Sequence, residues 1–317
     1  MRYIEITGIE RPVSVIGLGT TSKIFNPAGD DTVAEVIDAY LAVGGNCIDT
    51  AHIYGLGESE KALGRWLEHS GRRDDIVLVT KGCHPRVDEA GQFGPPRVNA
   101  DAIHSDLSES LERLGTDHVD LYLLHRDDET VPPGPLLEAL NEEKASGRIV
   151  AFGASNWTVE RIALANEYAG EHGLTGFAAS SPGLSLPRPV AMQFPGTLFA
   201  DDETRRWHAE TRLPVFAWTS LAAGFASGRF RPDDTDVDES TRAFFCEDNF
   251  ERMRRAQEVA EAHSASALQV ALAFVLGQEY PVVALVGPSK VENLHGALGA
   301  LEVELTPDEM RYLDLET

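Results

Sequence analysis

Among the titratable side chains of the first 125 residues, four are candidates for a proton-transfer set, and three of these directly follow short apolar runs. Asp49 follows "NCI", Lys81 follows "IVLVT" and His125 follows "VDLYLL", while Tyr54 comes five residues after Asp49. A phenol with its ordinary pKa of about 10 is a poor proton donor at neutral pH, but an adjacent ammonium group stabilises the phenolate and lowers that pKa. We therefore expect Lys81 to activate Tyr54.

The other two side chains complete a proton-transfer set. A buried lysine needs a carboxylate nearby to stay protonated, and Asp49 is the candidate. His125, with one donor nitrogen in its neutral form, is expected to orient a substrate oxygen or relay a proton. Taken singly, these residues have ordinary explanations as a helix cap, a solvated lysine or a core histidine. The chemistry depends on whether the fold brings them together.

Eight short apolar runs bounded by turn residues are candidates for parallel strands that are covered on both faces. They are "VSVIGLG" from Val13, "NCI" from Asn46, "IVLVT" from Ile76, "VDLYLL" from Val119, "RIVAFG" from Arg148, "TGFAAS" from Thr175, "VFAWT" from Val215 and "VVALV" from Val282.

Helical patterns separate these runs. The first helix is predicted from the stripe Val33, Val36, Ile37, Tyr40 and Leu41, with Asp30 or Asp31 as N-cap and Gly44 as the stop. Asn99 and Gly115 bound a second stripe: Ile103, Leu107, Leu111 and Leu114. Further helices are predicted over 136–147, 158–173, 201–211, 249–263, 266–277 and 290–300. Thr306, Pro307 and Glu309 start a C-terminal helix with a capping box.

Strand followed by helix, eight times without a linker, predicts a single domain over 1–317 with the closed (β/α)₈ TIM-barrel fold. The opening "YIEITGIERPVSV" predicts an N-terminal β-hairpin, and the C-terminal helix is extra to the barrel. Three connections, 82–98, 183–200 and 222–248, are too long for simple turns. Each follows a strand, so we expect extended loops on the C-terminal face of the barrel, where active sites lie.

A dinucleotide-binding sheet is the alternative, because "GLGTTS" from Gly17 resembles a glycine-rich phosphate loop. The match is weak. Ser22 occupies the third glycine position, and no strand-end acid follows about 20 residues later to bind a ribose hydroxyl.

Composition limits the partners. The 317 residues include 27 Lys and Arg against 51 Asp and Glu, a formal charge of −24 that repels nucleic acid and anionic membranes. Cys47, Cys83 and Cys246 are too few and scattered for a disulfide framework or a zinc site. The N-terminus has no signal-peptide core. We expect a cytoplasmic protein that acts on a small molecule, as a monomer or weak homo-oligomer.

At the residues already named, the sequence resembles the aldo-keto reductase superfamily over essentially the whole chain. The matching segments are "GLGT", "DTAHIYGLGESE", the "TK" of Lys81, "LLHRDD" and "GASN". The resemblance implies reversible, nicotinamide-dependent reduction of an aldehyde or ketone without a metal. It makes Tyr54 the general acid, tuned by Lys81 and Asp49, with His125 positioning the carbonyl.

The resemblance also suggests cofactor contacts. Ser155 and Asn156 match the pair that binds the nicotinamide carboxamide, Asp49 reaches the ribose, and Trp218 stacks on the nicotinamide ring. Gly19 and Thr20 complete this end of the site. "GPSKVENL" matches the adenosine-phosphate loop, which makes Ser289 and Lys290 candidates for the 2′-phosphate and Asn293 a further contact. NADPH or NADP⁺ is therefore expected over NADH.

Departures from the family pattern affect the same site. Ser181 stands where the family usually has a glutamine, and Gly296 and Ala297 stand where an acid and an asparagine often meet the adenine. His52, His84 and His125 raise the alternative of a metal site, as in barrel hydrolases, but their acidic neighbours lack a recognised ligand spacing.

Two other functions stay open: a non-catalytic regulatory subunit that senses the cofactor, and sugar epimerisation or lyase chemistry. The long loops decide the substrate. Arg86, His84, Arg97, Phe194 and Phe199 occur in them, and Trp157 and Phe225 are candidates for the pocket mouth or for the core. This composition suits a sugar-like carbonyl compound.

Overall fold

The structure, a computed structural model, describes residues 1–21, 23–88 and 91–316. Its chain begins with the predicted hairpin, strands β1 (Tyr3–Ile6) and β2 (Ile9–Ser14), which pair antiparallel. Gly8 turns the chain between them with a φ of +89°. The buried side chains of Ile6 and Ile9 pack in one cluster with inward-facing barrel residues such as Val77, the first residue of its strand. The hairpin thus covers the end of the barrel where the strands begin.

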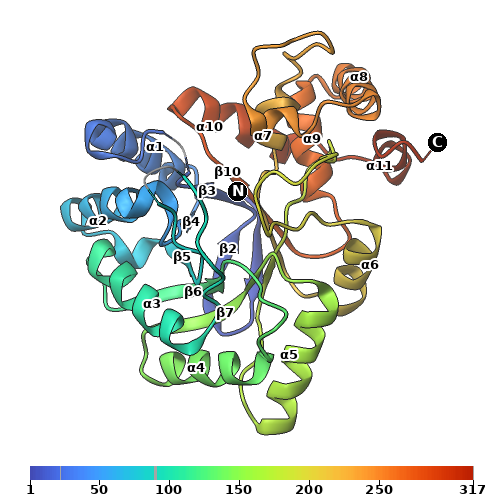
Figure 1. Cartoon of the computed structure of the whole chain (residues 1–317). Helices are drawn as coiled ribbons and strands as arrows, with labels where there is room; N and C mark the ends of the chain where they lie inside the picture. The colour runs from blue at the N-terminus through green and yellow to red at the C-terminus, as the bar shows by residue number, and fades with distance from the viewer. Residues whose placement is uncertain (22, 89–90, 317) are drawn as a thin grey trace.

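Eight parallel strands close into a barrel in the order β10-β3-β4-β5-β6-β7-β8-β9 (Figure 1). Their bounds are β3 (Ile16–Gly19), β4 (Cys47–Asp49), β5 (Val77–Gly82), β6 (Val119–Leu124), β7 (Ile149–Ser155), β8 (Ser180–Ser181), β9 (Val215–Ala217) and β10 (Val282–Val286). The predicted (β/α)₈ barrel with an N-terminal hairpin is confirmed.

Several predicted strand limits shift by one or two residues, and two predicted strands differ more from the observed ones. The run from Val13 to Gly19 is divided, because Val13 and Ser14 end the hairpin and the barrel strand starts at Ile16. The run from Thr175 is a regular strand only at Ser180–Ser181. Before that, the chain approaches Gly153 so closely that a Cβ there would lie 2.2 Å from the carbonyl oxygen of Ala179. Regular pairing is established only after this contact.

The helices surround the barrel (Figure 1). They are α1 (Asp30–Ala42), α2 (Glu58–Ser70), α3 (Ala100–Leu114), α4 (Pro133–Ala145), α5 (Val159–His172), α6 (Asp202–Thr211), α7 (Glu239–Arg242), α8 (Glu247–His263), α9 (Ala267–Leu276), α10 (Val291–Leu298) and α11 (Pro307–Leu313). Short 3₁₀ turns are η1 (Pro27–Gly29), η2 (Tyr54–Gly57), η3 (Arg73–Asp75), η4 (Ala222–Ser227) and η5 (Gly299–Glu302).

Most predicted helix ends follow from local capping. The Asn99 side chain accepts a hydrogen bond from the Ala102 amide, and Thr306 with Glu309 forms the predicted capping box. The N-cap predicted for the first helix is wrong: Gly29 occupies that position, and Asp30 lies in the first turn. There Asp30 accepts hydrogen bonds from Arg65 at 2.7 Å, so an ion pair between α1 and α2 takes the place of a cap.

Other helix limits shift by a few residues. Helix α4 begins at Pro133, α8 begins at Glu247, and α10 ends at Leu298, where η5 continues the chain. Among the described residues, none of the helices taken singly has the length and apolarity needed to cross a membrane. The pair α8 and α9 meets that test only jointly, across a 95° bend.

Candidate active site

The ends of three neighbouring strands bring Asp49, Lys81 and His125 to one face. Asp49 is the last residue of β4, Lys81 lies one residue before the end of β5, and His125 directly follows β6. Parallel pairing aligns these ends, with Asp49 opposite Val79 and Lys81 opposite Leu123. All three side chains line a cavity of about 640 Å³ at the carboxyl ends of the strands.

Tyr54 reaches this cavity from η2, the 3₁₀ turn between β4 and α2. The turn requires left-handed backbone at Gly55 (φ +57°) and Gly57 (φ +94°). A side chain at Gly57 would also meet Arg113, whose Cζ would lie 2.8 Å from the added Cβ. The glycines of "YGLGES" therefore have a local role, because they fold the chain back so that Tyr54 points at the strand ends.

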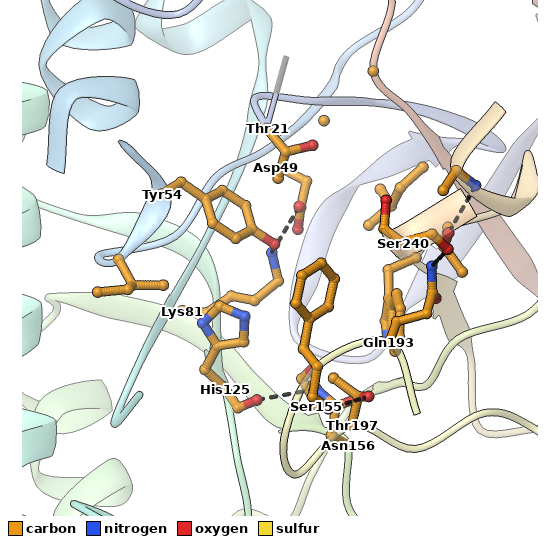
Figure 2. A pocket seen from close by; sticks show the side chains of 18 of the residues that line it. Thr21, Asp49, Tyr54, Lys81, His125, Ser155, Asn156, Gln193, Thr197 and Ser240 are labelled. Atoms are coloured by element: carbon orange, nitrogen blue, oxygen red, sulfur yellow. Dashed lines mark hydrogen bonds and ion pairs between the residues drawn. The ribbon is translucent and has the colours of Figure 1, made fainter. Parts of the chain in front are cut away.

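Lys81 connects the phenol to the acid (Figure 2). Its Nζ donates hydrogen bonds to Asp49 Oδ2 at 2.7 Å, to the carbonyl oxygen of Thr50 at 2.9 Å and to Tyr54 Oη at 3.2 Å. An ammonium group has three donors, so these contacts use all of them and fix its orientation. The Lys81 and Asp49 side chains are only 2% and 3% exposed, which makes this a buried ion pair.

The charge state of Lys81 follows from its neighbours. Burial by itself would lower the pKa of Lys81, but Asp49 and Tyr54 together outweigh burial and raise that pKa above its ordinary value. Burial raises the pKa of Asp49, and the Lys81 charge counteracts that effect. The contact is thus an ion pair between the Lys81 ammonium and the Asp49 carboxylate.

The expected lowering of the Tyr54 pKa does not occur. Burial raises the pKa of Tyr54, the Lys81 charge lowers it, and the balance stays above the ordinary value. The carboxylate of Asp49 also opposes ionisation of the phenol. Tyr54 is therefore protonated at neutral pH, and Lys81 acts by limiting the cost of phenolate formation.

His125 faces the same phenol. The centres of the His125 and Tyr54 rings are 5.6 Å apart in an edge-to-face arrangement. Burial, followed by the charges of Arg126 and Lys81, lowers the pKa of His125 well below its ordinary value, so the imidazole is neutral. Its Nδ1 has no hydrogen-bond partner within the described part of the chain. A neutral imidazole has one N–H to donate to a bound oxygen.

Asn156 and Ser155 also line the cavity, but most of their polar atoms are bound within the protein. Asn156 donates to the carbonyl oxygen of His125 at 3.1 Å and to Ser155 Oγ at 3.0 Å, and its Oδ1 accepts from the amide of Leu198 at 3.0 Å. Ser155 Oγ donates to the Ser181 carbonyl oxygen at 2.9 Å. Asn156 thereby joins the His125 backbone to the 183–200 loop.

The other predicted contacts divide into two groups. Gly19 and Trp218 line the cavity, and Trp218 Nε1 is buried without a partner in the described chain. Thr20 and Ser181 do not line it: Thr20 donates to Thr50 Oγ1 at 2.8 Å, and Ser181 donates to the carbonyl oxygen of Phe216 at 2.8 Å. Both hydroxyls are fully buried and serve the interior of the barrel.

The segment predicted for the phosphate lies just beyond the cavity wall. The wall includes Gly287, and the exposed Ser289 and Lys290 follow at the start of α10. Ser289 Oγ donates to Asn293 Oδ1 at 3.3 Å. Lys290 makes no ion pair with any residue that the structure describes. The ammonium group of Lys290 is thus available at a helix start, where an anion is electrostatically favoured.

A model of the aldo/keto reductase family matches residues 15–315. This chain belongs to the aldo/keto reductase family. It is 30% identical to the aldo-keto reductase str7 of Strobilurus tenacellus over 94% of this chain and 87% of that protein. It is 29% identical to norsolorinic acid reductase B of Aspergillus parasiticus, over 92% and 76% of the two chains.

Solved structures agree with the fold. The glycerol dehydrogenase AKR11B4 of Gluconobacter oxydans superposes with a TM-score of 0.81 at 24% identity, covering 98% of this chain and 94% of that one. An aldo/keto reductase of Klebsiella pneumoniae, in complex with NADP and acetate, has a TM-score of 0.74 at 24% identity, with 99% and 94% covered.

Several residues that line the cavity of this aldo/keto reductase were not predicted from the sequence. They are Thr21, Val87, Phe93, Arg126, Gln193, Thr197 and Ser220, together with residues of η4 and α7. Gln193 donates to the Ser240 carbonyl oxygen at 3.1 Å and so ties two long loops together over the cavity (Figure 2). Arg126 was visible in "LLHRDD", but an arginine just after a strand is usually solvated, so nothing marked it as a wall residue.

The aromatic residues proposed for the mouth are also divided. Phe194 lines the cavity and is 47% exposed. Phe225 is buried in the cluster below α8 and α9, and Trp157 is buried and donates to the carbonyl oxygen of Arg126 at 3.0 Å. Phe199 packs beside the Phe225 cluster and lies outside the cavity wall. None of these three side chains is among the described residues that line the cavity.

His52 lies in a different cluster from His125. His52, Asp106 and Glu109 place their ligand atoms within 4.8 Å of one another, but each acid is already paired. Arg97 donates to Asp106 at 2.9 and 3.0 Å, and Arg113 donates to Glu109 at 2.9 Å. This network holds α3 against the loops after β4 and β5, and its arginines already neutralise its carboxylates.

Proposed function

We propose that this chain catalyses the reversible, NADP(H)-dependent reduction of an aldehyde or ketone to an alcohol, with Tyr54 as the general acid. The observation that carries the proposal is the contact of Lys81 Nζ with both Tyr54 Oη and Asp49 Oδ2 inside one cavity. Family membership supports an oxidoreductase, and this contact supports proton transfer at a phenol.

A nicotinamide cofactor would supply hydride to the carbonyl carbon. As negative charge develops on the carbonyl oxygen, Tyr54 Oη donates a proton to it, and the neutral His125 donates a hydrogen bond to the same oxygen. Lys81 stabilises the phenolate that Tyr54 becomes, because its ammonium is held 3.2 Å away by Asp49. In the oxidative direction, the phenolate of Tyr54 accepts the proton of the alcohol.

The cavity suits such a cofactor. Asp49 Oδ1 and Trp218 Nε1, both on lining residues, are buried without partners in the described chain, so the wall offers an acceptor and a donor to a polar ligand. Asp49 would receive a ribose hydroxyl, Trp218 would pack on the nicotinamide ring, and Ser155 and Asn156 would border its carboxamide. Gly19, which pairs with Asp49 on the neighbouring strand, would allow the cofactor a close approach to the backbone there.

Ser289, Lys290 and Asn293 would hold the 2′-phosphate, which favours NADPH over NADH. The Klebsiella neighbour was solved with NADP, which agrees with this choice. Ser181 and Thr20 have no direct role in the proposal, because their hydroxyls are occupied and they lie outside the cavity wall.

The test is NADPH oxidation by the purified protein with a panel of aliphatic and aromatic aldehydes, keto-sugars and α-dicarbonyls, and NADP⁺ reduction with polyols. Turnover of at least one carbonyl compound is expected. Tight NADPH binding without turnover of any panel member would contradict a reductase and support a cofactor-sensing subunit. Isomerised or eliminated sugar products without net cofactor oxidation would support epimerase or lyase chemistry.

A further inference from the structure

Arg126 is a buried cation on the wall of the cavity. The residue is only 8% exposed, and its Nε donates to the Pro195 carbonyl oxygen at 3.2 Å while Nη1 donates to the His125 carbonyl oxygen at 2.9 Å. A guanidinium has five N–H donors, so the two contacts leave most of them available. No carboxylate in the described chain forms an ion pair with Arg126.

Other poorly exposed arginines of this chain do have acidic partners. Arg161 pairs with Asp127 at 2.9 Å, and Arg205 pairs with Asp314 at 2.6 Å. Removing a charge from water without a partner is costly, so a buried arginine that faces only carbonyl oxygens is an exception to be explained. The chain has 51 Asp and Glu against 27 Lys and Arg, a net charge of −24, so acidic partners for an arginine are plentiful.

The described wall of the cavity carries a net positive charge as a result. Among the residues that the structure describes, the charged wall residues are Asp49, Lys81 and Arg126, and the first two cancel as an ion pair. Burial lowers the pKa of Arg126 to about 10, which still leaves it protonated at neutral pH. One unmatched positive charge therefore remains, and it suits a ligand with a single negative charge.

The position of Arg126 separates it from the proposed cofactor-phosphate segment. Arg126 follows β6, whereas Ser289 and Lys290 follow β10, and these two strands are four places apart in either direction around the closed barrel. Arg126 is instead the neighbour of His125, and its charge acts on Tyr54, His84 and His125. Arg126 therefore lies on the side of the cavity that holds Tyr54 and His125.

We propose that Arg126 binds a carboxylate of the substrate, so that the preferred substrate is an aldehyde or ketone that carries a carboxylate. This inference rests on the proposed carbonyl reduction at Tyr54. The planar guanidinium matches a carboxylate in a two-point contact. Val87, Phe93 and Phe194 of the wall give the body of the substrate apolar contacts.

The test compares 4-carboxybenzaldehyde with its neutral methyl ester, methyl 4-formylbenzoate, as substrates with NADPH. Wild-type protein should prefer the acid in kcat/KM. In Arg126→Met, which keeps the length of the apolar stem, the ratio of acid to ester should fall on the order of 30-fold or more, mainly through KM for the acid. Arg126→Lys keeps the charge without the planar fork and should retain part of the preference.

Arg86→Met is the matched control. Arg86 lies on the neighbouring 82–98 loop, pairs with Glu109 at 3.4 Å and is outside the cavity wall, so its loss should leave the acid-to-ester ratio unchanged. Equal use of acid and ester by the wild type, or an equal fall for both substrates in Arg126→Met, would overturn the inference. The second result would show a purely structural role or a contact with the carbonyl oxygen alone.

The inference can fail separately from the proposed function. Turnover of both aldehydes without an acid preference would contradict the carboxylate site while supporting the reductase. Without turnover of either, thermal stabilisation by benzoate relative to methyl benzoate would still test Arg126. Benzoate-specific stabilisation that disappears in Arg126→Met supports the site, and its absence or persistence in the variant contradicts it.

Discussion

The ammonium of Lys81 lies 3.2 Å from the phenolic oxygen of Tyr54 and 4.8 Å from the centre of its ring. The nitrogen therefore sits beside the hydroxyl end of the phenol. Burial still keeps the Tyr54 pKa above its ordinary value. The proton stays on Tyr54 until a substrate oxygen takes it, and the fixed positive charge then stabilises the phenolate that remains.

Replacing Tyr54 with Phe removes the proton donor while keeping the ring. We expect kcat for carbonyl reduction to fall by roughly 100- to 10,000-fold, the usual contribution of a positioned general acid. NADPH affinity, measured by fluorescence titration, should change little because the phenol is not a proposed cofactor contact. A residual rate above a tenth of the wild-type value would show that another group donates the proton.

The Asp49–Lys81 pair should show strong coupling in a double-mutant cycle. Lys81→Met leaves a buried carboxylate without its partner and should lower the free energy of unfolding by about 3–5 kcal/mol. The double variant Asp49→Asn, Lys81→Met should be more stable than the sum of the single changes predicts, because neither charge is left unpaired. Urea unfolding of the three variants measures this coupling.

An exposed lysine provides the control for that cycle. Lys61 pairs with Glu58 at 2.7 Å on α2, and their side chains are 48% and 38% exposed. Lys61→Met should cost less than about 1 kcal/mol, since solvent screens the pair. Equal losses for Lys61→Met and Lys81→Met would contradict the assignment of a buried, coupled pair in the cavity.

The preference of the protein for NADPH over NADH should depend on Lys290 at the start of α10. Lys290→Met removes an ammonium proposed to bind the 2′-phosphate, and a charge-assisted hydrogen bond of this kind corresponds to roughly a ten- to hundredfold rise in KM for NADPH. KM for NADH should stay nearly constant, because NADH lacks that phosphate. Parallel changes for both cofactors would place the 2′-phosphate elsewhere.

Acid should destabilise the protein through His208. This side chain is fully buried on α6, its Nδ1 donates to the Leu213 carbonyl oxygen at 2.9 Å, and burial lowers its pKa to about 4. Between pH 6.5 and 4 the unfolded chain binds the proton that the folded chain excludes, so stability falls as pH falls. The loss from this residue amounts to about 3 kcal/mol at pH 4.

His208→Asn isolates that contribution, because the asparagine amide can donate to Leu213 without titrating. The difference in unfolding free energy between pH 7 and pH 4, measured by urea titration, should be smaller in the variant by about the amount above. Identical pH profiles for the two proteins would mean that His208 binds a proton equally well in the folded state.

Strand ends could be located from the sequence because their causes are local. A run such as "VDLYLL" between polar turns has few alternatives to a covered parallel strand, and parallel pairing carries the residue after it to a common face. Asp49, Lys81 and His125 could thus be assigned to one site, and Asn99 and Thr306 to helix starts, without knowledge of distant contacts.

Properties that depend on distant neighbours could not be obtained in that way. Burial raises the pKa of Tyr54, the Lys81 charge lowers it and the Asp49 charge raises it. Whether the pKa rises or falls could therefore be determined only from the packed site. Ser181 and Thr20 occupy positions along the chain that suit a cofactor contact. In the folded protein, however, each hydroxyl donates to a partner inside the barrel instead. The sequence also gives no sign that Arg126 is buried without a facing carboxylate in the described chain. Residue type and spacing establish which groups are available, whereas solvation and pairing are properties of the assembled interior.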